Sequence, residues 1–177
     1  RLVSFLLCIF PFEQKFFRVH GVVTSYVGHP LADAPVSETT REEFCDRCGL
    51  DPSLPIVALL PGSRRGESAR HIPHVLSAVE QIAAQKPANF VLAASNATGA
   101  EFFRERISAQ NVRIVENETQ NLLRFADVAL VASGTATVEA ALQGAPMVVF
   151  YRVSWSTWVL GKPLVRTPYY SMVNLLA

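Results

Sequence analysis

Apolar runs of four to six residues alternate with helix-like segments from residue 56 to residue 151. Continuous runs such as FVLAA and VALVA are typical of strands that are covered on both faces. The predicted strands are 56–60, 89–94, 112–115, 127–132 and 146–151. The predicted helices between them are 70–86, 98–109, 119–125 and 135–143. This alternation predicts an α/β fold, a doubly wound parallel sheet with helices on both faces.

The first forty residues follow a different pattern. Residues 2–10 form an apolar run that predicts a buried strand, and residues 12–19 form a short amphipathic stretch. Residues 28–40 are rich in proline and small polar side chains, as linkers often are. We therefore expect a boundary near residue 30, with one unit over 1–30 and another over 31–177. Because the chain starts without methionine and stops in an apolar run, we also expect it to be a fragment.

Threonines mark two predicted helix starts, the first at Thr39 or Thr40 and the second at Thr98. Thr39-x-x-Glu42 and Thr98-x-x-Glu101 both have the spacing of a capping box. The first of these helices would end near Cys45-Asp-Arg-Cys48, whereas a redox CxxC motif sits at a helix N-terminus. No further zinc ligands are evident nearby, so we interpret the two cysteines as thiols on an amphipathic helix.

Composition narrows the class of protein. The 177 residues carry a net charge of +1, which gives no support for bulk nucleic-acid binding. Three cysteines are an odd number, too few for a secreted disulfide framework, and indicate a reducing compartment. No small-residue cleavage site follows the first apolar run, which argues against a signal peptide. The run is also far shorter than the roughly 20 residues that span a bilayer, which argues against a membrane-spanning helix.

Two loops stand out as candidates for binding an anion. In the common strand order 3-2-1-4-5, the first and fourth strands are neighbours, and ligands bind beyond their carboxyl ends. The loop after the first strand contains Gly62, Ser63 and Arg64, and Arg64 could grip a phosphate with two hydrogen bonds. The loop after the fourth is ASGTATVE, residues 132–139, which opens a helix whose N-terminus favours an anion. Two such loops suit a diphosphate.

The second loop adds further candidate contacts. Gly134 would allow close backbone approach, and Ser133 and Thr135 offer hydroxyl donors. Glu139 lies about one turn into the helix and could accept hydrogen bonds from a ribose diol; the alternative is a solvated helix-face glutamate. Neither a Walker loop nor a GxGxxG fingerprint is present. Asp-x-Asp, the usual metal clamp of one sugar-nucleotide transferase class, is also absent, so we expect no metal and no cofactor.

The motifs LLPGSR, SGTATVEAALQGAPMVVFYR, YVGHPLAD and NLLA, together with PFE at 11–13, resemble the lipid-A-disaccharide synthase family of GT-B glycosyltransferases. The resemblance covers essentially the whole chain. It implies a Rossmann-like donor domain, with a first donor loop at Gly62, Ser63 and Arg64. It also implies a second donor loop from Ser133 to Thr137, Glu139 as the ribose ligand, and Asn174 as the asparagine of the NLL segment.

The resemblance also implies substrates and a cellular location. The donor would be UDP-2,3-diacylglucosamine and the acceptor 2,3-diacylglucosamine 1-phosphate, giving lipid A disaccharide 1-phosphate and UDP. The enzyme would be cytoplasmic and peripheral on the inner membrane of a Gram-negative bacterium, with assembly as a homodimer left open. The acceptor domain of the family precedes the donor domain and is expected to supply the general base, so residues 1–30 would be its end and the hinge. This chain alone would then be inactive.

Several roles stay open at the level of sequence. His29 is either the general base or a structural histidine at the hinge. His71 and His74 have i, i+3 spacing but no evident third metal ligand, and solvated or supporting histidines are the simpler interpretation. Residues 151–170 mix aromatic and basic side chains, which suits either a membrane interface or ordinary packing. Alternative functions are a UDP-sugar 2-epimerase, another UDP-sugar transferase, or a nucleotide-sugar binding module without activity.

Overall fold

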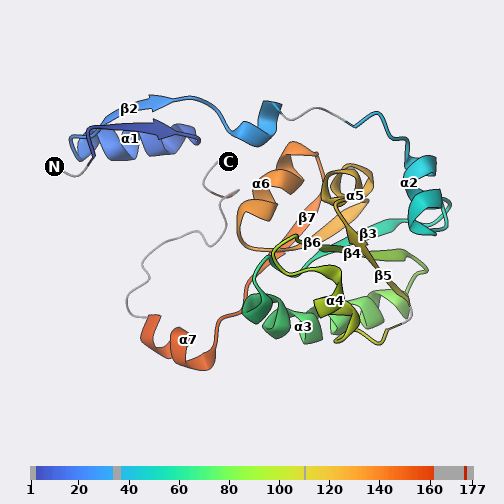
Figure 1. Ribbon diagram of the computed structural model, residues 1–177. Coiled ribbons are helices and arrows are strands. Elements are labelled where there is room, and N and C mark those ends of the chain that lie inside the picture. Colours follow the sequence, from blue (N-terminus) through green and yellow to red (C-terminus); the bar gives the residue numbers. More distant parts are fainter. Residues whose placement is uncertain (1–2, 34–36, 110, 162–173, 175–177) are drawn as a thin grey trace.

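The computed structural model describes the whole chain except residues 1–2, 34–36, 110, 162–173 and 175–177. Its main feature is a parallel five-stranded sheet with the order β5-β4-β3-β6-β7 (Figure 1). The strands are β3 (Ile56–Leu60), β4 (Asn89–Ala94), β5 (Val112–Glu116), β6 (Val128–Ala132) and β7 (Met147–Phe150). Counted along the chain from β3, this order is 3-2-1-4-5, so the predicted doubly wound topology is confirmed.

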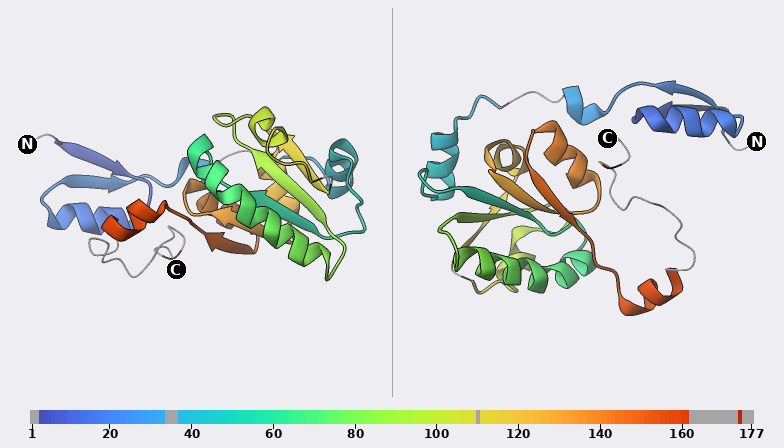
Figure 2. Two further views of the ribbon diagram at one scale, coloured as in Figure 1. Left: turned by 90° about the horizontal axis from the view of Figure 1, so that it is seen from below. Right: turned by 180° about the vertical axis from the view of Figure 1, so that it is seen from behind.

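Helices cover both faces of this sheet, as Figures 1 and 2 show from three directions. α2 (Arg41–Cys48), α5 (Thr119–Phe125) and α6 (Thr135–Leu142) pack on one face, and α3 (Arg65–Ala83) and α4 (Ala100–Arg104) pack on the other. All five residues of β3 are buried. Ile56, Ala58 and Leu60 join the first core, whereas Val57 and Leu59 join the second, because side chains alternate across a strand.

Two helix boundaries differ from the prediction in ways that matter for the site. α3 begins at Arg65 rather than at residue 70, and it continues through Pro73, a residue type that favours positions near a helix start. α4 has five residues and follows Gly99, so Thr98 is not its cap. Instead, the carboxylate of Glu116 accepts the backbone N–H of Ala100 at 2.8 Å. Consequently α3 starts directly after the Gly62–Arg64 loop, and Thr98 is available for another contact.

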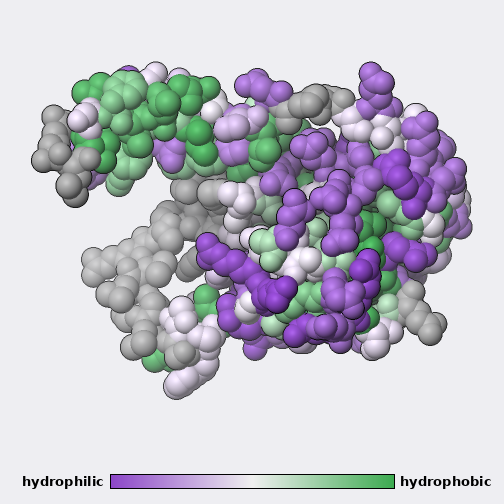
Figure 3. Space-filling view, viewed as in Figure 1, coloured by the Kyte–Doolittle hydropathy of each residue, from purple (hydrophilic) through white to green (hydrophobic). Residues whose placement is uncertain are grey.

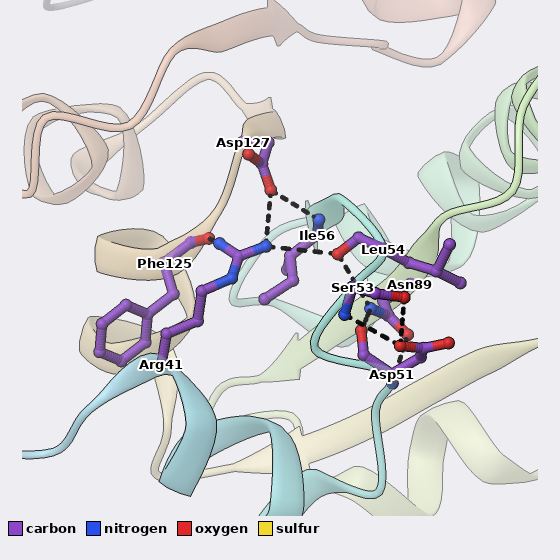
Figure 4. A network of polar contacts seen from close by, with 8 residues as sticks. All are labelled: Arg41, Asp51, Ser53, Leu54, Ile56, Asn89, Phe125 and Asp127. Atoms are coloured by element: carbon purple, nitrogen blue, oxygen red, sulfur yellow. Dashed lines mark hydrogen bonds and ion pairs between the residues drawn. The ribbon is translucent and has the colours of Figure 1, made fainter.

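α2 is anchored to the sheet at the end opposite to that loop. The Arg41 guanidinium donates to the backbone carbonyl of Phe125 at 2.6 Å and pairs with Asp127 at 3.0 Å (Figure 4). Asp127 also accepts the backbone N–H of Ile56 at 2.8 Å. This network therefore joins α2 to the amino-terminal ends of β3 and β6.

Two details of α2 bear on the sequence predictions. Its cap is Thr40, one of the two predicted starts, and the capping box runs to Glu43 instead of from Thr39 to Glu42. Cys45 and Cys48 are buried on this helix, and burial raises the pKa of both thiols. Both cysteines are therefore protonated packing residues at neutral pH, in agreement with the interpretation from sequence.

The first thirty residues build a separate small sheet. β1 (Phe5–Cys8) and β2 (Val23–Tyr26) pair in parallel, with α1 (Pro11–Val19) between them in the chain. A short 3₁₀ helix, η1 (Pro30–Asp33), follows them. β1 confirms the predicted strand but not its burial, because among its residues only Cys8 is buried. The reason is that β2 is its sole partner among the described residues, and β2 itself was not predicted.

Large apolar side chains are exposed on this unit and form a conspicuous apolar surface in Figure 3. Near the C-terminal end of the chain, α7 (Trp155–Gly161) carries the exposed Trp155 and Trp158. Four other aromatic and basic residues of the stretch 151–170 lie outside the described residues, namely Lys162, Arg166, Tyr169 and Tyr170. Within the described part of the chain, no helix combines the length and apolarity needed to cross a membrane.

Candidate functional site

A cavity of about 1580 Å³ lies at the edge of the sheet where all five parallel strands end. Each of the five following loops contributes to its wall, for example through Arg64, Ser95, Asn117, Gly134 and Arg152. β3 and β6 are neighbours at the centre of the sheet, so the two loops predicted to bind an anion face the same space. The structure therefore brings Gly62, Ser63 and Arg64 together with Ser133, Gly134, Thr135 and Glu139 in one cavity.

Buried hydroxyl groups hold the first loop from behind. The carbonyl oxygen of Gly62 accepts the Ser68 hydroxyl at 3.0 Å, and that of Ser63 accepts the Thr98 hydroxyl at 2.8 Å. Both donors are buried, and Ser95 adds a longer bond to Ser63 at 3.3 Å. The carbonyl groups of this loop therefore accept hydrogen bonds from the protein itself, and these bonds fix the conformation of the loop before any ligand binds.

The same loop leaves its donors available. Within the described residues, the backbone N–H groups of Gly62, Ser63 and Arg64 donate to no other part of the chain. The Arg64 guanidinium is exposed and likewise makes no hydrogen bond or ion pair there. A row of unpaired N–H groups beside a free guanidinium, at the start of a helix, is an arrangement that binds anions.

Gly62 is required by the geometry of this loop. Its φ of +121° lies in a region that residues with a side chain rarely adopt. A Cβ built at this position would also lie 2.7 Å from Oε2 of Glu67, a residue that lines the cavity. Glycine therefore allows both the turn and the close approach of the Glu67 carboxylate.

The second loop differs in part from the first, because the backbone N–H of Ser133 donates to the carbonyl oxygen of Phe150 at 2.8 Å, and its available donors lie at the start of α6. α6 begins at Thr135, and the first N–H groups of a helix have no partner within the helix. A Cβ built at Gly134 would meet no heavy atom within 4 Å, which leaves room for a ligand next to the backbone. Thr137 is different: it is fully buried, and its hydroxyl donates to the carbonyl oxygen of Gly134 at 2.7 Å. The structure places Thr137 behind the loop rather than in the cavity wall, contrary to its expected role as a contact.

Glu139 lies one turn into α6 and lines the cavity. Burial raises the pKa of its carboxyl, and the nearby charge of His29 opposes that rise. His29 itself does not line the cavity; its Nδ1 accepts the backbone N–H of Leu31 at 3.3 Å, and its ring packs against Phe10. Asn174 is exposed and is also not part of the cavity wall. The structure therefore brings Glu139 to the predicted site but leaves His29 and Asn174 outside it.

The sequence analysis missed several residues of the cavity wall, namely Glu67, Ser95, Asn117, Asn121, Tyr151 and Arg152. All but Glu67 belong to segments that follow β4, β5 or β7, and one signal could have found those segments. Parallel strands end at the same edge of a sheet, so every such segment was a candidate.

Of the two alternatives for His71, solvated or supporting, burial removes the first, because this histidine is fully buried. As for metals, the described residues contain no group of three or more histidine, cysteine, aspartate or glutamate side chains that could hold an ion.

Comparison with known proteins places this chain in a family. The model of the family described as lipid-A-disaccharide synthetase matches residues 1–177. A lipid-A-disaccharide synthase of Solibacter usitatus (strain Ellin6076) is 51% identical over 177 residues, covering 100% of this chain and 46% of that protein. Lipid-A-disaccharide synthases of Myxococcus xanthus (strain DK1622) and Coxiella burnetii (strain Dugway 5J108-111) are 38% and 36% identical, each with 100% of this chain and 47% of the relative covered. The chain spans about half the length of these relatives, and it belongs to the lipid-A-disaccharide synthetase family.

Proposed function

We propose that this chain is the donor half of a glycosyltransferase that moves 2,3-diacylglucosamine from UDP to 2,3-diacylglucosamine 1-phosphate, releasing UDP and lipid A disaccharide 1-phosphate. The observation that supports this most is the single cavity flanked by the Gly62–Arg64 loop and the N-terminus of α6. A UDP group matches it, because the diphosphate meets unpaired N–H groups and Arg64 while Glu139 accepts from the ribose hydroxyls.

The proposed chemistry of this half is stabilisation of the leaving group. When the bond between the sugar's anomeric carbon and the diphosphate oxygen breaks, the electron pair moves onto the β-phosphate. Arg64 and the two loops are already in place to stabilise that charge, since their carbonyl sides are held by the protein. Loss of one such preorganised donor typically costs about 2.7–4 kcal/mol of transition-state stabilisation.

The same displacement also needs a base, which takes the proton of the acceptor hydroxyl as its oxygen forms the new bond to the anomeric carbon. We propose that this base belongs to the part of the protein that the family carries beyond this chain, with residues 1–30 as the end of the acceptor domain. The separate β1-β2 sheet and its exposed apolar residues support this assignment. His29 is the alternative base, although its Nδ1 accepts from Leu31 and its ring lies outside the cavity wall.

The lipid substrates also bear on location. We propose a cytoplasmic protein that contacts the inner membrane peripherally, because Trp155 and Trp158 of α7 are exposed beside the cavity. Amphipathic aromatic side chains of this kind favour the membrane–water interface. Flotation with anionic vesicles tests this: the paired change Trp155→Ser and Trp158→Ser should lower the bound fraction, and unchanged binding would contradict it.

The activity itself is tested by UDP release from UDP-2,3-diacylglucosamine with acceptor present, using this chain and a chain extended to the full length of its relatives. We expect turnover from the extended protein and none from this chain, because positioning of the acceptor can account for roughly 7–11 kcal/mol of a barrier. Equal rates would place the base within these residues. UDP binding without turnover by the extended protein would favour a nucleotide-sugar binding module, and conversion of the donor without acceptor would favour an epimerase.

A further inference from the structure

Two histidines of α3 hold one arginine at the cavity wall. Nε2 of His71 accepts the backbone N–H of Arg152 at 3.1 Å, and Nε2 of His74 contacts Nη1 of the same arginine. Their i, i+3 spacing places both rings on one side of α3. The start of this helix lies beside the segment that leads from β7 to α7 (Figure 1). One histidine therefore fixes the backbone of Arg152, and the other fixes its side chain.

His71 also connects Arg152 to the first loop. Its Nδ1 lies 2.7 Å from the carbonyl oxygen of Pro61, the residue directly N-terminal to Gly62. A carbonyl only accepts and a backbone N–H only donates, so the ring is neutral with its proton on Nδ1. The ring is fully buried and packs edge-on against Phe150 at 5.1 Å. This burial leaves the bridge between the two segments little freedom to move.

The strand order of the sheet places the two segments that His71 joins on either side of the Gly134 loop. β6 lies between β3 and β7, so the Gly134 loop lies between the loop that carries Arg64 and the segment that carries Arg152. Both arginines line the cavity and are exposed. An anion at the N-terminus of α6 would therefore meet a guanidinium from each flanking segment. Guanidinium groups bind phosphate oxygens with two parallel hydrogen bonds, which makes such a pair suitable for a diphosphate.

We propose that Arg152 is a second arginine of the diphosphate site and that His71 and His74 are positioning residues that act through it. This inference rests on the proposed function, in which the cavity holds UDP. It gives the histidine pair a role in orienting an arginine.

Calorimetric titration of this chain with UDP and with uridine separates the diphosphate from the nucleoside. Arg152→Ala should weaken UDP about ten-fold or more, as expected for loss of a charged hydrogen bond, and should leave uridine unchanged. His71→Asn can still offer a donor near Pro61, but it is too short to reach Arg152, so it should also weaken UDP selectively. The double variant His71→Asn with Arg152→Ala should bind UDP no more weakly than Arg152→Ala alone.

A merely structural role for His71 gives a different pattern, in which UDP and uridine weaken alike and the two changes add; that pattern would overturn the inference. His74→Asn provides an exposed variant that should fold normally and should weaken UDP but not uridine. In the unmodified chain, long-range ¹H–¹⁵N spectra should show His71 protonated on Nδ1, and protonation on Nε2 would also overturn it. If Arg64→Ala weakens UDP but Arg152→Ala does not, this inference fails alone; if the unmodified chain does not bind UDP, the proposed function fails with it.

Discussion

The hydroxyl of Thr98 donates a 2.8 Å hydrogen bond to the carbonyl oxygen of Ser63, 35 residues away in the chain. Thr98 is buried, so this bond joins the loop after β4 to the Gly62–Arg64 loop from the inside. It belongs with the bond from Ser68 to Gly62, which holds the preceding carbonyl. The conformation of the Gly62–Arg64 loop is thus set by side chains that do not line the cavity.

Thr98→Val should therefore loosen the first loop while preserving the volume of the side chain. A buried carbonyl that loses its partner costs about 1–3 kcal/mol, and we expect the low end because Ser95 also donates to Ser63. Chemical denaturation should show this loss, and UDP affinity should fall several-fold. Ser77→Ala, an exposed change on α3, is the control. UDP affinity equal to that of the control would show that the loop does not depend on Thr98.

Gly62→Ala and Gly66→Ala form a matched pair at the start of α3. Gly62 has a φ of +121° and the Glu67 carboxylate beside it, so alanine there should cost about 1–2 kcal/mol of stability and weaken UDP. Gly66 is helical, and its nearest neighbour would lie 4.0 Å from a new Cβ. Alanine at this position should stabilise the protein by about 0.5–1 kcal/mol. Thermal unfolding measures both, and similar effects from the two changes would contradict the account of the loop.

Glu139→Gln tests the ribose contact. The change should weaken UDP by about 1.5–3 kcal/mol, the range for hydrogen bonds that involve a charged group. Because burial raises the pKa of Glu139, the folded state holds this proton more tightly than the unfolded chain. The contribution of Glu139 to the free energy of unfolding therefore falls as pH rises from 4.5 through the raised pKa of the folded state. Glu139→Gln should leave the free energy of unfolding at neutral pH unchanged or slightly higher. Glu80→Gln, on the exposed side of α3, is the control; a large loss of stability with unaltered UDP affinity would make Glu139 structural.

Asp127→Asn tests the network that joins α2 to the sheet. The hydrogen bond from Ile56 lowers the pKa of Asp127; partial burial opposes this and Arg41 adds to it. A lowered pKa contributes stability that is present above 3.8 and lost as pH falls through the folded value. Asparagine should cost about 1 kcal/mol at neutral pH, since the pair is partly solvated, and the cost should vanish in acid. Urea unfolding across pH checks this against Asp46→Asn; a cost that persists unchanged in acid would rule out the ionised carboxylate as its cause.

The central sheet could be predicted from sequence because each strand is short, apolar and bounded by turn residues. β3 and β4 have the predicted limits, and the predicted strand order correctly implies that Arg64 and Gly134 share one cavity. The predicted helix 70–86 began five residues too late, because residues 65–69 are mostly polar, contain Gly66 and show no apolar helical pattern.

Other features depend on contacts between distant parts of the chain. The sequence alone could not show that Thr98 bonds to Ser63 instead of capping α4, because this requires the loops after β3 and β4 to be side by side. The resemblance placed Thr137 in the second donor loop, yet its side chain is buried and its hydroxyl donates to the carbonyl oxygen of Gly134. β2 was missed because its four residues show neither a long apolar run nor clear alternation.

Titration of this chain with UDP in the presence of a chelator tests the central claim most directly. We expect saturable binding without a metal, because Arg64 and the backbone N–H groups of two loops supply the positive potential. Arg64→Ala should weaken UDP by about 1.5–3 kcal/mol, whereas Arg104→Ala, on α4 and outside the cavity wall, should not. Binding that disappears with the chelator, or that is unchanged in Arg64→Ala, would contradict the assignment of this cavity as the UDP site.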